Sequence, residues 1–202
     1  MSSTGRPAGS AVPVGGGGAP LLNIANALTV LRLLLVPVFA LALLAEDGRD
    51  VTWRLVAFVV FALAAFTDRL DGQLARRRGL ETWFGALADP IADKALTGTA
   101  LIGLSVLGLV PWWVTAVIIG RELGVTVLRF VVIRRGVIPA SRGGKAKTVA
   151  QTVAIGLFVL PLPLLLPGLV TAALVLQWSV MVIALMLTVL TGADYVRKAL
   201  RG

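Results

Sequence analysis

The chain contains neither cysteine nor histidine. Without cysteine the protein can form no disulfide and carry out no thiol chemistry, so the sequence leaves its redox compartment open. Without histidine, any proton transfer must use Asp, Glu, Lys, Tyr or water instead of an imidazole. A site built only from carboxylates and other oxygen ligands favours Mg²⁺, Mn²⁺ or Ca²⁺.

Charged residues are also scarce. They make up 14% of the 202 residues, hydrophobic residues make up 57%, and the mean hydropathy is +0.92. No charge occurs at residues 95–120 or 148–193, and the second window is long enough for two spans of roughly 20 residues. We therefore predict an all-α integral membrane protein whose single membrane domain covers residues 21–202. Residues 1–20 form a Gly/Pro-rich tail that lacks signal-peptide features, and we expect it to be disordered.

Apolar runs predict six transmembrane helices, with a proline-rich turn at residues 161–168 before the last one. The expected ranges are 27–44, 51–76, 86–109, 112–133, 148–166 and 170–190. Positive charge gathers after the second helix, after the fourth and at the C-terminus, whereas the other connections are nearly bare. By the positive-inside rule, both termini lie in the cytoplasm and the protein is a multi-pass protein of the inner cell membrane.

The formal net charge of +9 has two possible physical meanings. A basic surface can mark a nucleic-acid-binding protein, but the sequence has none of the recognisable binding motifs of that class. In a chain this apolar, cytoplasmic loops facing anionic headgroups explain the charge better. The expected partner is therefore the lipid bilayer and not nucleic acid.

Four aspartates interrupt the apolar pattern where the second and third predicted helices meet. Asp68 lies about 17 residues into a helix from Val51, which at about 1.5 Å per residue places it roughly 26 Å across, near the cytoplasmic edge of the hydrocarbon. Asp71 follows on the same side, and the third helix carries Asp89 and Asp93 back into the membrane at the same level. Four carboxylates can therefore face one another.

Buried carboxylates at this density are costly unless a cation lies among them. One Asp at the centre of a membrane helix costs about 2.5–3.5 kcal/mol, so four approach roughly 12 kcal/mol before their mutual repulsion is counted. Arginines can offset part of this cost, but crowded carboxylates resist simultaneous ionisation without a cation between them. We expect Mg²⁺ (or Mn²⁺), as two ions of the kind that stabilise the attacking and leaving oxygens of a displacement at phosphorus.

The spacing around these aspartates is specific to one family. The chain resembles the CDP-alcohol phosphotransferases, whose signature DxxDGxxAR, eight residues, GxxxDxxxD is matched by Asp68, Asp71, Gly72, Ala75, Arg76, Gly85, Asp89 and Asp93. The resemblance implies a six-helix, commonly dimeric membrane fold that displaces CMP from a CDP-linked donor with an alcohol. It implies that the four aspartates bind the metals and that Asp93 is the base that deprotonates the acceptor hydroxyl. The residues that would surround the CDP group are Gly72, Ala75, Arg76 and Gly85.

Segments outside the signature indicate which subfamily the chain resembles. NIANALTVLRLLLVPVF, RELGVTVLR and GKAKTVAQ resemble the phosphatidylglycerophosphate synthases. That subfamily joins CDP-diacylglycerol to sn-glycerol 3-phosphate, and the glycerol hydroxyl attacks the β-phosphorus without a covalent enzyme intermediate. Because the acceptor is itself a phosphate monoester, its site needs fixed cations beyond the metals. By resemblance, the acceptor-phosphate residues are Arg121, Arg129, Lys145 and Lys147.

Several of these cations also have structural interpretations. Arg121 could be a partner of Glu122, although an ion pair within the membrane would still need a reason. Lys145 and Lys147 could be ordinary cytoplasmic charge. Arg32, in the first predicted helix, could extend to the membrane interface or contact a substrate phosphate, and we favour the structural interpretation. Each small residue of the signature, taken alone, could equally serve helix packing.

Other functions remain open as well. A cardiolipin synthase of the same fold would use phosphatidylglycerol as acceptor, and a phosphatidylinositol phosphate synthase would use inositol phosphate. A divalent-cation transporter is an alternative from another class, because intramembrane aspartates also mark ion pathways. A transporter should carry acidic or polar groups towards the outer face too, and the third, fifth and sixth predicted helices have no charge there.

Overall fold

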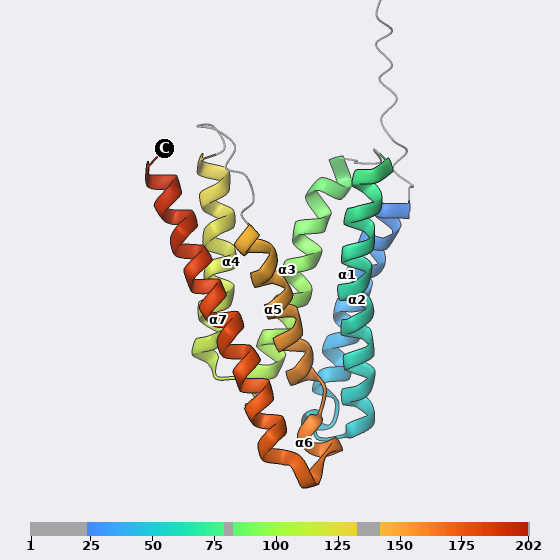
Figure 1. Cartoon of the computed structure of the whole chain (residues 1–202). Coiled ribbons are helices and arrows are strands. Elements are labelled where there is room, and N and C mark those ends of the chain that lie inside the picture. Colours follow the sequence, from blue (N-terminus) through green and yellow to red (C-terminus); the bar gives the residue numbers. More distant parts are fainter. Residues whose placement is uncertain (1–23, 79–82, 133–141, 202) are drawn as a thin grey trace, which may run out of the picture.

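The computed structural model describes the backbone of residues 24–78, 83–132 and 142–201, and the side chains of residues 27–67, 91–128 and 144–198. Within these residues the fold is all helical and has no strand (Figure 1). The helices are α1 (Ile24–Leu44), α2 (Val51–Arg78), α3 (Trp83–Val106), α4 (Trp112–Val132), α5 (Arg142–Val159), the single turn α6 (Leu162–Leu165) and α7 (Val170–Arg201), with short 3₁₀ segments at Ala45–Gly48 and Pro167–Leu169. The predicted N-terminal tail, residues 1–20, lies outside the described residues.

The helical prediction is confirmed, with three corrections in the C-terminal half. The first four helices begin and end close to the predicted limits. α5 begins at Arg142, so Lys145 and Lys147, expected in a loop, lie in a helix. It also ends at Val159, because Pro161 cannot continue its hydrogen bonding. α7 continues past Leu190 to Arg201, beyond the end of the apolar run.

Two helices of the described chain are long and apolar enough to cross a membrane by length and composition. They cover Ala27–Gly48 and Pro167–Lys198, and a shorter apolar helix covers Val51–Thr67. Large apolar side chains also face outwards, for example Leu41, Phe66 and Leu190, which are 75%, 60% and 64% exposed. An apolar outer surface of this extent is typical of a protein whose solvent is lipid. The count of six spans stays a prediction.

The long helices run alongside one another in a bundle (Figure 1). α1 packs mainly against α2 and α3, and α7 packs mainly against α5 and α4. The C-terminal ends of α2, α4 and α7 and the N-terminal ends of α3 and α5 point to the same end of the bundle, which we call the site end (Figure 1). The connection α6 lies at the opposite end. This arrangement brings the two halves of the aspartate signature, one in α2 and one in α3, to the site end.

A buried arginine ties the helices together at the end opposite the site end. Arg54 donates from Nε to the Val159 carbonyl at 3.0 Å, from Nη2 to the Phe158 carbonyl at 2.5 Å and from Nη1 to the Gly48 carbonyl at 3.1 Å. The two α5 carbonyls belong to its last turn, where a helix leaves acceptors without partners. Arg54 therefore joins α2 to α5 and to the α1–α2 turn, and it satisfies acceptors that lipid could not.

Candidate active site

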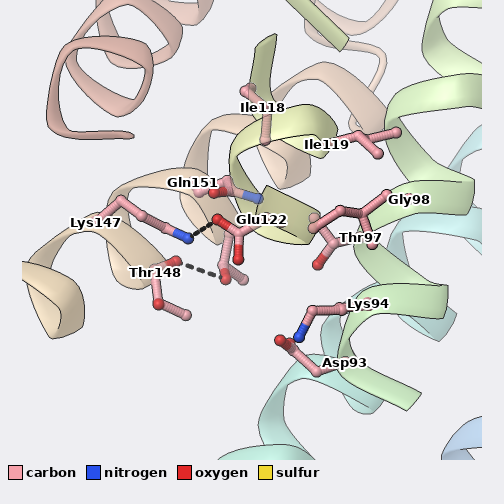
Figure 2. Close-up of a pocket in the computed structure, with 12 residues that line it drawn as sticks. Asp93, Lys94, Thr97, Gly98, Ile118, Ile119, Glu122, Lys147, Thr148 and Gln151 are labelled. Atoms are coloured by element: carbon pink, nitrogen blue, oxygen red, sulfur yellow. Dashed lines mark hydrogen bonds and ion pairs between the residues drawn. The ribbon is translucent and has the colours of Figure 1, made fainter. Parts of the chain in front are cut away.

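A polar cavity of about 90 Å³ lies between α3, α4 and α5. Its polar lining comes from all three helices, and Figure 2 shows these side chains turned towards one another. The residues that matter below are Asp93, Lys94 and Thr97 of α3, Glu122 of α4, and Lys147 and Gln151 of α5. A cavity that combines carboxylates with cations inside an apolar bundle is a candidate site for an anionic ligand.

Asp93, the predicted base, lines this cavity from α3 and is partly buried. It lies four positions after Asp89, and the backbone of both residues is helical, as the predicted spacing requires. Lys94 lines the cavity beside it. A carboxylate in this position can accept a proton from a hydroxyl group that enters the cavity.

Lys147 approaches the cavity from α5. Its ammonium forms an ion pair with the Oε1 atom of Glu122, 25 positions away in the sequence. The Lys147 side chain is only 6% exposed, which is unusual for lysine and argues against ordinary surface charge. Lys145 is exposed and does not line the cavity. The two lysines, predicted together, therefore differ in their surroundings.

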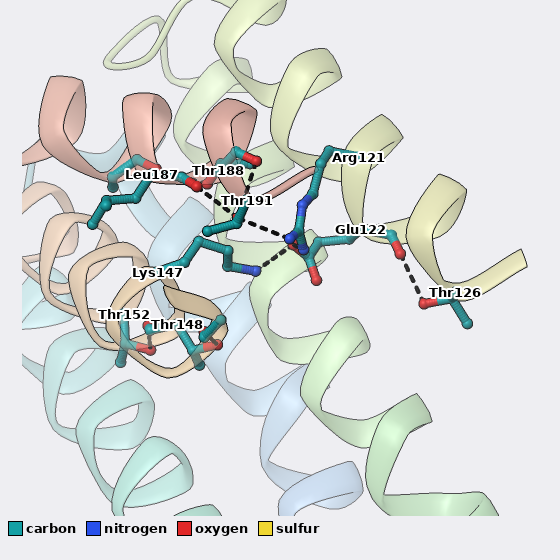
Figure 3. A network of polar contacts seen from close by, with 11 residues as sticks. Arg121, Glu122, Thr126, Lys147, Thr148, Thr152, Leu187, Thr188 and Thr191 are labelled. Atoms are coloured by element: carbon teal, nitrogen blue, oxygen red, sulfur yellow. Dashed lines mark hydrogen bonds and ion pairs between the residues drawn. The ribbon is translucent and has the colours of Figure 1, made fainter. Parts of the chain in front are cut away.

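Arg121 joins the same network from α4 (Figure 3). Its Nη1 donates to Glu122 Oε1 at 3.0 Å, so one carboxylate oxygen holds both Arg121 and Lys147. Its Nη2 donates to Thr191 Oγ1 of α7 at 2.9 Å. The structural partnership of Arg121 with Glu122 is thus present, but it is one contact of a cluster that links α4, α5 and α7. A negatively charged ligand entering this cluster would meet two cations already held in place.

Several signature residues have side chains outside the described part of the chain, although their helical backbone is described. In α2 these are Asp68, Asp71, Gly72, Ala75 and Arg76, in α3 they are Gly85 and Asp89, and in α4 the predicted phosphate residue Arg129 belongs to the same group. Among the side chains that are described, no three or more carboxylates gather as a metal site would need. The arrangement of the four aspartates stays a prediction.

The chemistry of the donor set fits a divalent metal. The helices that carry the four aspartates contact each other, and their signature segments point to the site end (Figure 1). Asp93 offers a carboxylate at the edge of the cavity. Carboxylate oxygens, in a chain without His or Cys, are the ligands that Mg²⁺ and Mn²⁺ accept.

An apolar groove of about 370 Å³ runs between α2 and α5. Phe61 and Phe66 line it from α2, and Gly156 lines it from α5. Phe66 comes two positions before Asp68, so the groove reaches the turn of α2 where the signature begins. Thr152 lines both the groove and the polar cavity, which makes the two neighbours. A molecule with an apolar chain and a polar head could occupy the two together.

Three features of the structure were not predicted from the sequence. Gln151 is 5% exposed, lines the cavity, and has a buried Oε1 without a hydrogen-bond partner among the described residues. Its position four residues after Lys147 places both on one face of α5, a signal that the sequence did offer. The second feature, the contact between Arg121 and Thr191, joins residues 70 positions apart and has no such signal. The third concerns Arg32, which is fully buried in α1 and so does not extend to an interface.

The chain is similar to known proteins of one family over most of its length. Residues 22–190 match the family model described as CDP-alcohol phosphatidyltransferase. The chain is 60% identical over 185 residues to a "probable phosphatidylglycerophosphate synthase" of Mycobacterium tuberculosis, covering 92% of this chain and 85% of the relative. It is 37% identical over 189 residues to a "CDP-diacylglycerol--glycerol-3-phosphate 3-phosphatidyltransferase" of Bacillus subtilis, covering 88% of this chain and 95% of the relative. It is also 40% identical over 140 residues to the Escherichia coli K12 protein of the same description, covering 66% of this chain and 74% of that relative.

Proposed function

The chain belongs to the CDP-alcohol phosphatidyltransferase family, and on this basis we propose that it transfers the phosphatidyl group of CDP-diacylglycerol to sn-glycerol 3-phosphate. The products are phosphatidylglycerophosphate and CMP. The names of relatives that share 60% and 37% identity over most of the chain support this reaction. The structural observation that carries the proposal is that Asp93 and the buried Lys147 line one cavity, because the acceptor needs a base for its hydroxyl and a cation for its phosphate.

The donor occupies the site end of α2 and α3. Gly72, Ala75, Arg76 and Gly85 surround its CDP group, as the family resemblance implies. The apolar groove beside Phe66 fits one hydrocarbon chain of a lipid, and it borders the polar cavity at Thr152, so in our proposal the reacting phosphate lies between the two. Support for a lipid donor therefore comes from the groove as well as from the family.

A divalent metal belongs to this site, and members of the family generally depend on one. Asp68, Asp71, Asp89 and Asp93 would hold Mg²⁺ or Mn²⁺, in our proposal as two ions. When bound, the metal supplies positive charge that balances the pyrophosphate and the CMP leaving group.

The acceptor enters the polar cavity with its phosphate towards Lys147 and Arg121. Arg129 and Lys145 are further candidates for the phosphate, by resemblance. Asp93 accepts the proton of the glycerol hydroxyl, and the freed oxygen forms a bond to the β-phosphorus of the donor. The bond from that phosphorus to the CMP oxygen breaks, and CMP leaves into the cytoplasm without a covalent enzyme intermediate. Much of the rate enhancement then comes from holding the two substrates in position.

The membrane arrangement is part of the same proposal. Six spans, with both termini and the site end in the cytoplasm, agree with the exposed Arg197 and Lys198 near the C-terminal end of α7. At the opposite end Trp53, Trp112 and Trp113 are exposed, where aromatic rings prefer a membrane interface. The protein would be a homodimer in the inner membrane, an expectation that comes from the family resemblance.

An acceptor panel tests the reaction. Purified protein in detergent or vesicles is given CDP-diacylglycerol with sn-glycerol 3-phosphate, phosphatidylglycerol or inositol phosphate in turn, and released CMP is measured. We expect release with glycerol phosphate alone, because the cations at the cavity suit a small phosphate monoester. Release with phosphatidylglycerol alone would identify a cardiolipin synthase and overturn the proposal.

Arg121→Ala separates the acceptor from the donor. Loss of a charge-assisted hydrogen bond of about 1.5–3 kcal/mol raises the KM for glycerol phosphate about 10- to 100-fold. The dissociation constant for CDP-diacylglycerol stays within about twofold, because the donor is held elsewhere. Steady-state kinetics and a donor-binding titration measure the two effects. Arg197→Ala, an exposed arginine of α7, is the matched control and leaves both values unchanged; a donor affinity that falls as much as the acceptor affinity would contradict the assignment.

A further inference from the structure

The guanidinium of Arg121 is held by α7 as well as by its own helix. Its Nη2 donates to Thr191 Oγ1 at 2.9 Å (Figure 3). Thr191 Oγ1 in turn donates to the Leu187 carbonyl of its own helix at 2.6 Å. With its proton used in this way, the hydroxyl oxygen offers its lone pairs to Arg121. Because a guanidinium can only donate, the threonine hydroxyl is the acceptor, and α7 fixes the position of its oxygen.

Gly192, the next residue of α7, leaves room for the arginine. It is buried, and a Cβ atom there would lie 3.0 Å from Arg121 Cγ and 3.3 Å from Arg121 Nε. These distances are tighter than ordinary contacts, so alanine would push against the stem of the arginine. Glycine is a poor helix former, and its presence inside a long helix calls for a packing reason. The close approach of Arg121 supplies that reason.

The two contacts fix the plane of the guanidinium. Nη1 donates to Glu122 of α4 and Nη2 donates to Thr191 of α7, so acceptors on two helices hold the two terminal nitrogens of the guanidinium. Nε is buried and has no hydrogen-bond partner in the described part of the chain. The planar guanidinium has five N–H donors, and these contacts use two of them. The remaining donors keep a fixed orientation, which suits bidentate recognition of a phosphate.

We propose that Thr191 and Gly192 are positioning residues for the acceptor phosphate: they hold Arg121 in the orientation that binds it. This inference rests on the proposed function and adds α7 to a site whose other proposed residues lie in α2, α3, α4 and α5. A purely structural role, in which the same residues only pack α7 against α4, makes a different prediction, because packing has no reason to act through Arg121.

The experiment compares Gly192→Ala and Thr191→Val with the matched control Gly124→Ala, where a new Cβ would meet open space. We expect each of the first two to raise the KM for glycerol phosphate about three- to tenfold, the size expected for one misplaced hydrogen bond. The KM for CDP-diacylglycerol, kcat at saturating acceptor and the melting temperature stay near the wild-type values. Thr191→Ser, which keeps the hydroxyl, has the wild-type KM for glycerol phosphate, and so does Gly124→Ala.

The decisive measurement is the KM for glycerol phosphate of Gly192→Ala and Thr191→Val when each is combined with Arg121→Ala. If Thr191 and Gly192 act through Arg121, neither raises the KM further once the guanidinium is gone. An undiminished rise in that background would overturn the inference, and so would an unchanged KM in both single variants. Turnover by the wild-type protein is measured first. If the wild type shows no turnover with glycerol phosphate, the proposed function is wrong. If the wild type turns over and the KM of Gly192→Ala and of Thr191→Val is unchanged, only the positioning role is wrong.

Discussion

Asp93→Asn lowers CMP release by about 10³-fold or more, while the purified protein keeps its melting temperature. The amide has the size of the carboxylate but cannot accept the proton of the acceptor hydroxyl. Loss of a general base alone costs roughly 10²–10⁴-fold, and a proposed metal ligand is lost at the same time. Initial rates of CMP release, measured with saturating glycerol phosphate and CDP-diacylglycerol, give the ratio.

The control for this substitution is Asp194→Asn. Asp194 is an exposed aspartate of α7 whose carboxylate contacts Lys198 at 2.7 Å on the surface. Exposed pairs of this kind contribute little to stability, so both activity and melting temperature stay near the wild-type values. Asp93→Asn with more than about a tenth of wild-type activity would exclude Asp93 as the base, since even a weak general base contributes roughly 10²-fold.

Removal of divalent metal abolishes turnover, the second large effect. Treatment with EDTA brings CMP release to background, and Mg²⁺ or Mn²⁺ in excess over the chelator restores it. The physical reason is the accumulation of negative charge: in the proposed site, four carboxylates, a pyrophosphate and the acceptor phosphate would meet at one end of the bundle. Undiminished turnover in EDTA, with total metal below the enzyme concentration, would contradict the account. Sodium chloride added to the same ionic strength, without a chelator, is the control and leaves turnover unchanged.

Much of the helical framework could be predicted from the sequence, because the apolar runs are bounded by strong turn signals. The EDGRD segment ends the first run and Pro111 separates the third from the fourth, and both boundaries are found in the structure. The end of α7 could not be predicted in this way. The apolar run ends at Leu190, but a helix can continue beyond the apolar part of its sequence. Here the i, i+4 ion pair of Asp194 and Lys198 stabilises the continuation.

The predicted start of α5 was wrong because the local composition of its first turns is not typical of a helix. Its first turns contain Gly143 and Gly144 beside Lys145, a composition that favours a loop. The helix nevertheless begins at Arg142, and helical geometry then turns Lys147 inwards to Glu122. Burial of that lysine depends on a partner 25 positions away, and local pattern carries no information about it.

In the candidate site, too, features set by local spacing could be predicted from the sequence, and features set by tertiary packing could not. The spacing of Asp89 and Asp93 predicts a shared helix face, and the helical backbone of α3 agrees with it. Arg121 was predicted as a phosphate residue by resemblance. Its hydrogen bond to Thr191 depends on the packing of α4 against α7, and only the structure could supply it.

The central claim, that the aspartates of α2 and α3 form a divalent-metal site, is tested most directly by Mn²⁺ titration followed by electron paramagnetic resonance. Purified wild-type protein, Asp89→Asn and the control Asp194→Asn are titrated in the same detergent, without substrate. The account predicts saturable Mn²⁺ binding by the wild type and by Asp194→Asn, and binding weakened at least about tenfold in Asp89→Asn, since one charged ligand is lost. Equal Mn²⁺ affinity in all three proteins would contradict it.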